Sequence, residues 1–222
     1  MKKLMGFIAL IVFIAVAAKA YVVPTFRDIK PASQVMLERQ AFGAPVVADD
    51  NRIKTTYAGS TSAAAVTLTS FTAQPDVPRN LTITPGGTAA DVEACDIVVN
   101  GTNFFGRTMT ETFSIPNDMS TAVTGNKAFK TVTSIVWPAN CEGGSFGGTW
   151  IVGVGDKLGI KRCMANAGDW AWSESSGTFS GTRATVAVSA TAVESNTADF
   201  NETMDGSAQM IGFFVQNFAC LP

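Results

Sequence analysis

The loop Asp199–Gly206 comes closest to a metal-binding pattern in this sequence. Its carboxylate and amide oxygens alternate along the chain, as the ligands of calcium-binding loops do. Met204, however, stands where such loops place glycine, and Met210 stands where they place the bidentate glutamate. The loop therefore predicts a polar turn, and we expect no metal site in the chain.

The glycine-rich stretch Glu142–Gly148 is the candidate for phosphate binding. A phosphate-binding loop ends in Gly-Lys-Ser or Gly-Lys-Thr, because the lysine reaches the phosphates and the hydroxyl binds the magnesium ion. This stretch contains no lysine. It predicts a turn between two strands rather than a nucleotide site.

The complete absence of histidine removes several chemistries at once. Ser–His–Asp and Cys–His nucleophiles, histidine-ligated zinc or iron, and a histidine pH switch all require that side chain. The 18 acidic residues fall mostly in expected turns or at strand ends, and no motif singles out a pair for glycoside hydrolysis. We predict that the chain is not an enzyme and needs no cofactor.

The cysteines Cys95, Cys141, Cys163 and Cys220 form an even set without a Cys-x-x-Cys pair. This spacing does not favour zinc. Two interpretations stay open: two disulfides in an oxidising compartment, or four buried thiols in a reducing one. If disulfides form, three connectivities are possible. Cys141 and Cys163 are close enough in sequence to be a natural pair, which would leave Cys95 with Cys220.

The overall composition describes a globular chain with sparse charge. It has 222 residues, 46% of them hydrophobic and 15% charged, and a formal net charge of −2. This hydrophobic content excludes a largely disordered chain. Loss of residues 1–20 would remove three lysines, leaving 13 basic against 18 acidic residues and a charge of −5. In either form the charge does not favour nucleic acid as a partner.

Residues 1–20 form a hydrophobic segment with three possible uses. Two lysines, an uncharged run and the site Ala18-Lys19-Ala20 follow the order of a secretory signal peptide cut before Tyr21. Retained, residues 4–23 are long enough for one membrane-spanning or assembly helix. A prepilin-type leader cut after Gly6 is the third possibility, although Ile11 occupies the position where such pilins carry glutamate. All three possibilities stay open.

Residues 21–62 predict an extended arm. Pro24, Pro31 and Pro45 interrupt it, and each proline removes a backbone donor and disfavours helix at the preceding residue. A short helix is predicted over Ala32–Phe42, because apolar residues recur at helical spacing and Gly43 follows as a stop signal.

Residues 63–222 predict an all-β domain, because short runs of β-forming residues alternate with turns. Asn100-Gly101 lies between two such runs and predicts a hairpin. Eight short strands without intervening helices indicate an antiparallel β-sandwich or jelly-roll, with the extended arm and the hydrophobic N-terminal helix before it. The expected strands lie within residues 63–70, 80–84, 91–99, 106–115, 127–137, 150–154, 183–193 and 209–218.

Aromatic residues near the C-terminus are the candidate contact residues. Trp170 and Trp172 are two apart and are expected on the same face of a strand. Such residues either fill a core or form an interface. The candidates for an interface are Trp170, Trp172, Phe213, Phe214 and Phe218.

Four blocks of the sequence, taken in order, resemble a known family. They are Gln74–Thr84, then Val99–Asn103 with Gly106–Phe113, then Asn126–Ile135, and last Val152–Ile160. Over about residues 63–163 their order and spacing are similar to those of small virion structural proteins of tailed phages, the head-decoration or head-fibre type. Within these blocks we expect Arg79 to begin a strand after Pro75 and Pro78, and Gly155–Gly159 to form a tight turn.

The resemblance implies a non-enzymatic virion subunit, such as a capsid decoration protein. Its expected partners are copies of itself, in a homo-oligomer, and other virion proteins of the capsid or tail. Contact with a membrane is possible through residues 4–23. The alternative is a secreted or surface-anchored β-sandwich with disulfides, either a binding module or a filament subunit, located outside the cell after Sec export.

Overall fold

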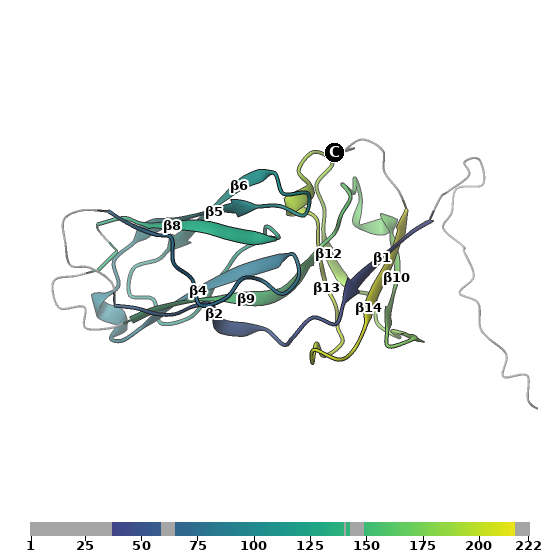
Figure 1. The fold of residues 1–222 in the computed structure, drawn as a ribbon, viewed down its shortest axis with the longest axis horizontal. Coiled ribbons are helices and arrows are strands. Elements are labelled where there is room, and N and C mark those ends of the chain that lie inside the picture. The colour runs from purple at the N-terminus through teal and green to yellow at the C-terminus, as the bar shows by residue number, and fades with distance from the viewer. Residues whose placement is uncertain (1–36, 59–64, 140, 143–148, 216–222) are drawn as a thin grey trace, which may run out of the picture. The chain divides into compact units, whose positions relative to one another are not determined.

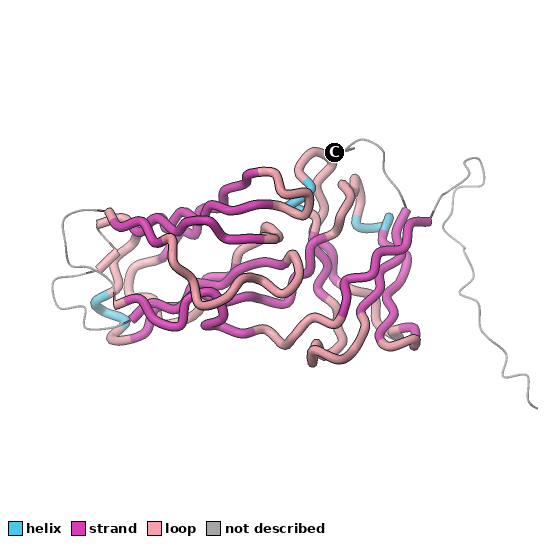
Figure 2. The backbone as a smooth tube through the Cα atoms, viewed as in Figure 1, coloured by secondary structure: helices cyan, strands magenta, loops and turns pink. Residues whose placement is uncertain are grey.

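The computed structural model describes residues 37–58, 65–139, 141–142 and 149–215. The chain divides into two units, Met1–Val35 and Met36–Pro222, and every described residue belongs to the second. The described part is all-β, with antiparallel strands and three short 3₁₀ turns, as Figures 1 and 2 show. The predicted hydrophobic N-terminal helix and residues 1–36 as a whole lie outside the described residues.

The described residues form three antiparallel sheets. Sheet A has the order β1 (Leu37–Gly43), β14 (Met210–Val215), β10 (Trp170–Ser175) and β11 (Thr178–Phe179). Sheet B has the order β12 (Thr185–Ala187), β13 (Thr197–Asp199), β9 (Thr149–Gly159), β4 (Arg79–Gly86) and β7 (Val123–Thr124), with β2 (Asp49–Tyr57) also paired to β9. Sheet C has the order β3 (Val66–Leu68), β8 (Thr131–Trp137), β5 (Cys95–Thr102) and β6 (Thr108–Ile115).

The 3₁₀ turns are η1 (Ala89–Asp91), η2 (Ala167–Asp169) and η3 (Val193–Ser195). Each lies in a connection between strands rather than on a sheet face. The packing of the three sheets therefore defines the architecture of the described residues.

A first hydrophobic core lies between sheets B and C, which face each other in Figure 1. Sheet B contributes residues such as Leu81 and Trp150, and sheet C contributes residues such as Ile97 and Phe113, all almost completely buried. In β5 and β6 the buried residues alternate with outward ones, because successive side chains point to opposite sides of a sheet. One face of sheet C is consequently buried in this core and the other points outward.

A second core packs the inner face of sheet A against the C-terminal part of sheet B. Trp170 and Phe214 stack there at a centroid distance of 5.9 Å, and both are fully buried. Strand β9 joins the two cores, since its Trp150 and Val154 lie in the first and its Leu158 lies in the second. The long strand thus runs from one core to the other.

The guanidinium of Arg79 lies at the junction between these cores and is completely buried. Its Nε donates to Gly155 O at 2.7 Å, and its Nη1 donates to Val46 O at 2.9 Å and to Asp76 Oδ1 at 3.1 Å. The second carboxylate oxygen of Asp76 accepts from Val46 N–H. One arginine therefore connects β4, β9 and the segment that leads into β2.

The pKa of Asp76 reflects the same network. Burial by itself raises it, but the hydrogen bond from Val46 N–H and the charge of Arg79 hold the pKa of Asp76 below its usual value. The carboxylate is thus kept ionised as the partner of a buried cation.

Most strand predictions for residues 63–222 are confirmed. The alternation over residues 106–115 becomes β6, with Met109, Glu111 and Phe113 buried on one face, and β4 begins at Arg79 as expected. The hairpin at Asn100-Gly101 exists, but both residues lie within β5 and the turn is displaced to Asn103–Arg107.

The tight turn predicted at Gly155–Gly159 is wrong. These residues continue β9, and β4 and β13 pair with this part of the strand. Neither glycine has a positive φ. A Cβ at Gly155 would meet the Asn80 side chain at 2.6 Å, so glycine here allows close approach rather than a turn.

The prediction for residues 21–62 also needs correction. Residues 37–57 contribute β1 and β2 to sheets A and B, so this part of the predicted arm is built into the domain. The helix predicted over Ala32–Phe42 is wrong from Leu37 onward. Pairing with β14 overrides the weak helical spacing, because it buries Gln40 and Phe42 on the inner side of sheet A.

The disulfide of the first core joins Cys95 to Cys141, with Cα atoms 5.1 Å apart. The predicted natural pair, Cys141 with Cys163, is therefore wrong, as is Cys95 with Cys220. Cys163 is fully buried and is also disulfide-bonded. Cys220 lies outside the described residues.

Candidate functional site

The outer face of sheet C is an exposed surface that is almost free of charge. Thr108, Thr110, Thr112 and Ser114 of β6 all point outward and are exposed. We call this surface, with the outward residues of β5 and β8, the threonine face. Asp96 is its single charged residue. The members from β5 and β8 are Asp96, Val98, Asn100, Thr102, Thr131, Thr133, Ser134 and Val136.

Hydrogen bonds between side chains organise this face across its strands. Thr110 Oγ1 donates to Asn100 Oδ1 at 2.8 Å, and Asn100 Nδ2 donates to Ser134 Oγ at 3.1 Å, so one row crosses β6, β5 and β8. The hydroxyls of Thr102 and Thr131 lie 2.6 Å apart in the next row. Many of the polar groups of the face thus already bind one another.

The outer face of sheet A is the second candidate surface, and we call it the aromatic face. Trp172 and Phe213 stack there with centroids 4.9 Å apart, and both are half-buried. Phe179 of β11 packs edge-on against Trp172 at 6.0 Å and is 47% exposed. Arg39 and Glu174 are the outward charged residues beside these rings.

The sequence expectation that Trp170 and Trp172 share a face is wrong. The register of β10 against β14 shifts between them, which marks a β-bulge. A bulge inserts one residue and reverses the side-chain alternation. Trp170 therefore lies in the second core with Phe214, while Trp172 lies outside with Phe213.

Of the five predicted interface residues, two lie on the aromatic face and two lie in the core. Trp172 and Phe213 belong to the face, Trp170 and Phe214 are fully buried, and Phe218 lies outside the described residues. Phe179 was missed. Its signal was Ser176-Gly177, whose residues both have positive φ and turn β10 into β11, as such dipeptides do in hairpins.

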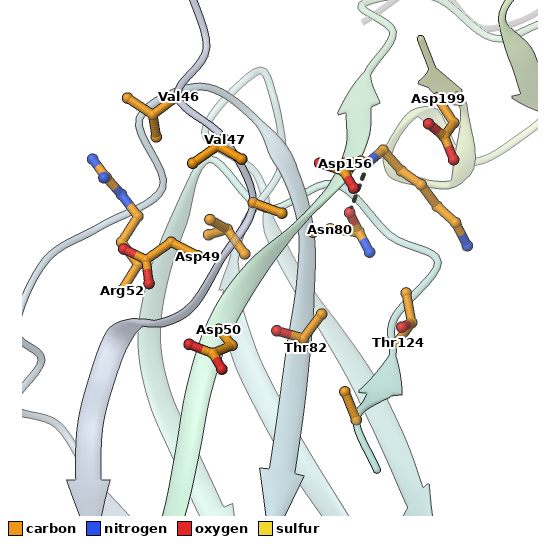
Figure 3. A pocket seen from close by; sticks show the side chains of 15 residues that line it. Val46, Val47, Asp49, Asp50, Arg52, Asn80, Thr82, Thr124, Asp156 and Asp199 are labelled. Atoms are coloured by element: carbon orange, nitrogen blue, oxygen red, sulfur yellow. Dashed lines mark hydrogen bonds between the residues drawn. The ribbon is translucent and has the colours of Figure 1, made fainter. Parts of the chain in front are cut away.

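A polar depression of about 750 Å³ lies on sheet B where β2 and β13 both meet β9. Figure 3 shows Asp156 and Asp199 on one side of it and Asp49 and Arg52 on the other. Asn80 forms part of its wall, is completely buried, and accepts from Lys157 N–H at 2.9 Å while donating to Gly125 O.

The electrostatics of the depression are dominated by its carboxylates. Burial raises the pKa of Asp199, and the nearby negative charge of Asp156 raises it further. No group of three or more acidic or cysteine residues in the described part of the chain is placed to hold a metal ion. The loop Asp199–Gly206 carries a local turn instead, in which Asp205 accepts from the backbone of Ser207 and Ala208.

Glu111 is the most deeply buried carboxylate behind the threonine face. Its Oε1 accepts from Asn126 N–H at 2.6 Å and from Lys127 N–H at 3.2 Å. Burial raises the pKa of Glu111 above its usual value of 4.5, against the opposing effect of these bonds and of Lys127 and Lys157. The folded state therefore binds this proton more tightly than the unfolded state does.

This raised pKa predicts that stability falls as pH rises from 4.5 through the pKa of folded Glu111. Glu111→Gln keeps an acceptor for both amides and removes the charge, so this part of the pH dependence should disappear. Urea unfolding between pH 4 and pH 7 measures it, with the exposed Glu93→Gln as the control. If the free energy of unfolding changed with pH in the same way for the wild type and Glu111→Gln, the raised pKa of Glu111 would be contradicted.

Within the described ranges, none of the helical turns approaches the length or apolarity needed to cross a membrane. Residues 4–23, for which a membrane contact was expected, are not among them. Comparison of the chain with family models, with curated proteins and with solved structures finds no match.

Proposed function

We propose that this protein is a non-enzymatic structural subunit of a virus particle, which acts by packing its threonine face against neighbouring virion proteins. The threonine face carries the proposal, because it combines exposure, near-absence of charge and internal hydrogen bonding on one sheet. The resemblance of residues 63–163 to phage virion proteins supports it. Within this proposal, sheets B and C form the two layers of a β-sandwich.

Burying the threonine face against a neighbour should cost little free energy, for three physical reasons. Interface centres are depleted of charge, and this face offers little charge to repel a second copy or to desolvate. Several of its hydroxyls already have partners within the face, so these donors do not lose a hydrogen bond when water is excluded. Threonine is also stiff about χ1, so little side-chain entropy is lost on contact.

The experiment is quantitative mass spectrometry of purified virus particles from cells that express the gene. The expected result is this chain at a fixed ratio to the major coat protein after stringent washing. Its absence from washed particles, with the protein free in the medium, would contradict the proposal.

The second candidate function is a secreted or surface-anchored binding module or filament subunit. It is favoured by the Cys95–Cys141 disulfide and by the bonded state of Cys163, since disulfides persist in oxidising compartments. Intact mass separates the two: loss of residues 1–20 from exported, particle-free protein supports this second candidate.

A further inference from the structure

We propose that the aromatic face of sheet A is a self-association surface, on which two copies of this chain meet face to face about a two-fold axis. Trp172 and Phe213 form its centre, Phe179 lies beside them on β11, and Arg39 of each copy lies opposite Glu174 of the other. The inference goes beyond the proposed function, because it names a different sheet and a defined partner.

The aromatic residues supply the contact area. Phe179 is 47% exposed, and it touches both Trp172 and Phe213, at centroid distances of 6.0 and 6.4 Å. Large aromatic side chains provide most of the binding energy in protein interfaces when they lie near the centre. The three rings hold one another in position, so little conformational freedom remains to be lost on association.

The strand register places two opposite charges beside these rings. Arg39 on β1 pairs with Phe213 of β14, and Glu174 on β10 pairs with Ile211 of β14. Arg39 and Glu174 lie on the two strands that flank β14, so they are separated by two strand spacings of about 4.8 Å each and by two residues along the strand, about 7 Å. Their Cα atoms are therefore about 12 Å apart on the diagonal. Neither charge enters an ion pair with any other described residue.

This arrangement is self-complementary. In a face-to-face pair, the two-fold axis lies between the two sheets and parallel to them. We draw it perpendicular to the line from Arg39 to Glu174, through its midpoint. The axis then crosses β14 between Phe213 and Ile211. Rotation about that axis brings Arg39 over Glu174 of the second copy, and the reverse pair forms at the same time. Phe213 and Trp172 lie close to the axis, so the rings of the two copies meet at the centre.

A second copy is the occupant that this charge pattern fits. Each pair of opposite charges is formed twice, and both become less hydrated as the rings exclude water around them. A partner with one uniform charge would attract one of the two residues and repel the other. The geometry therefore points to the chain itself.

The test is charge reversal, measured by sedimentation velocity on the full chain over a dilution series. Arg39→Glu and Glu174→Arg should each weaken the dimer Kd at least tenfold, because like charges then face each other twice. The double variant R39E/E174R restores both ion pairs with the positive and negative charges exchanged, and its dimer Kd should return to within threefold of the wild type. Arg107→Glu makes the same charge change on the β5–β6 turn and should have no effect.

Each outcome decides the proposal. A wild type that stays monomeric at its highest soluble concentration overturns it, and so does a double variant that associates no better than the single ones. If either single variant fails to fold, Phe179→Ser replaces it and should weaken the dimer Kd at least tenfold. The measurement needs no virus particle, so its failure leaves the proposed function untouched.

Discussion

Replacing Arg79 with lysine is expected to lower the free energy of unfolding by about 1–3 kcal/mol for each buried carbonyl that loses its donor. Lysine keeps the charge but cannot present the planar set of donors that reaches Gly155 O, Val46 O and Asp76 together. At least one buried carbonyl then loses its partner, and each such loss costs about 1–3 kcal/mol.

Urea unfolding followed by tryptophan fluorescence measures the Arg79 effect. Arg52→Lys is the matched control, because Arg52 makes a single bond, from Nε to Gln74 O, at an exposed site. The control should stay within about 0.5 kcal/mol of the wild type, as surface substitutions usually do. A similar small change for Arg79→Lys would show that this arginine does not hold β4, β9 and the segment before β2 together.

The double substitution C95A/C141A is expected to lower stability by about 4 kcal/mol. The two cysteines are 46 residues apart, and the entropy of closing a loop of that length in the unfolded chain gives this value. Both sulfur atoms also lie in the first core, so alanine removes packed volume as well.

The disulfide effect is measured on the oxidised double variant by the same urea unfolding. The bond at Cys163 stays intact in this variant, so the change reports on the Cys95–Cys141 bridge alone. A loss below about 1 kcal/mol would lie outside the usual range for native disulfides and would contradict a structural role for this one.

Local patterns made the strands predictable. The alternation at residues 106–115 predicts β6 and its buried face, because the two-residue period is a property of a single strand. The same alternation marks Thr108, Thr110 and Thr112 as outward. The alternation does not reveal which strands lie side by side in a sheet. The threonine face exists only because β5 lies between β6 and β8 in sheet C.

Features that depend on distant pairing were not predictable. The bulge that separates Trp170 from Trp172 arises from the register of β10 on β14, which follows about 40 residues later in sequence. The burial of Arg79 depends on carbonyls of Val46 and Gly155, which belong to two other segments. The cysteine pairing failed for the same reason, since nearness in sequence is not nearness in the fold.

The central claim is that the threonine face joins this chain to a virus particle, and incorporation of a charged variant tests it most directly. The double variant T110K/T112K places two cations on the face, whereas Thr185→Lys changes another exposed threonine, on β12 of sheet B. Particles assembled with each variant are purified, and the copy number of this chain is measured by mass spectrometry. We predict at least a tenfold loss for T110K/T112K and wild-type levels for Thr185→Lys; incorporation of both at wild-type levels would contradict the account.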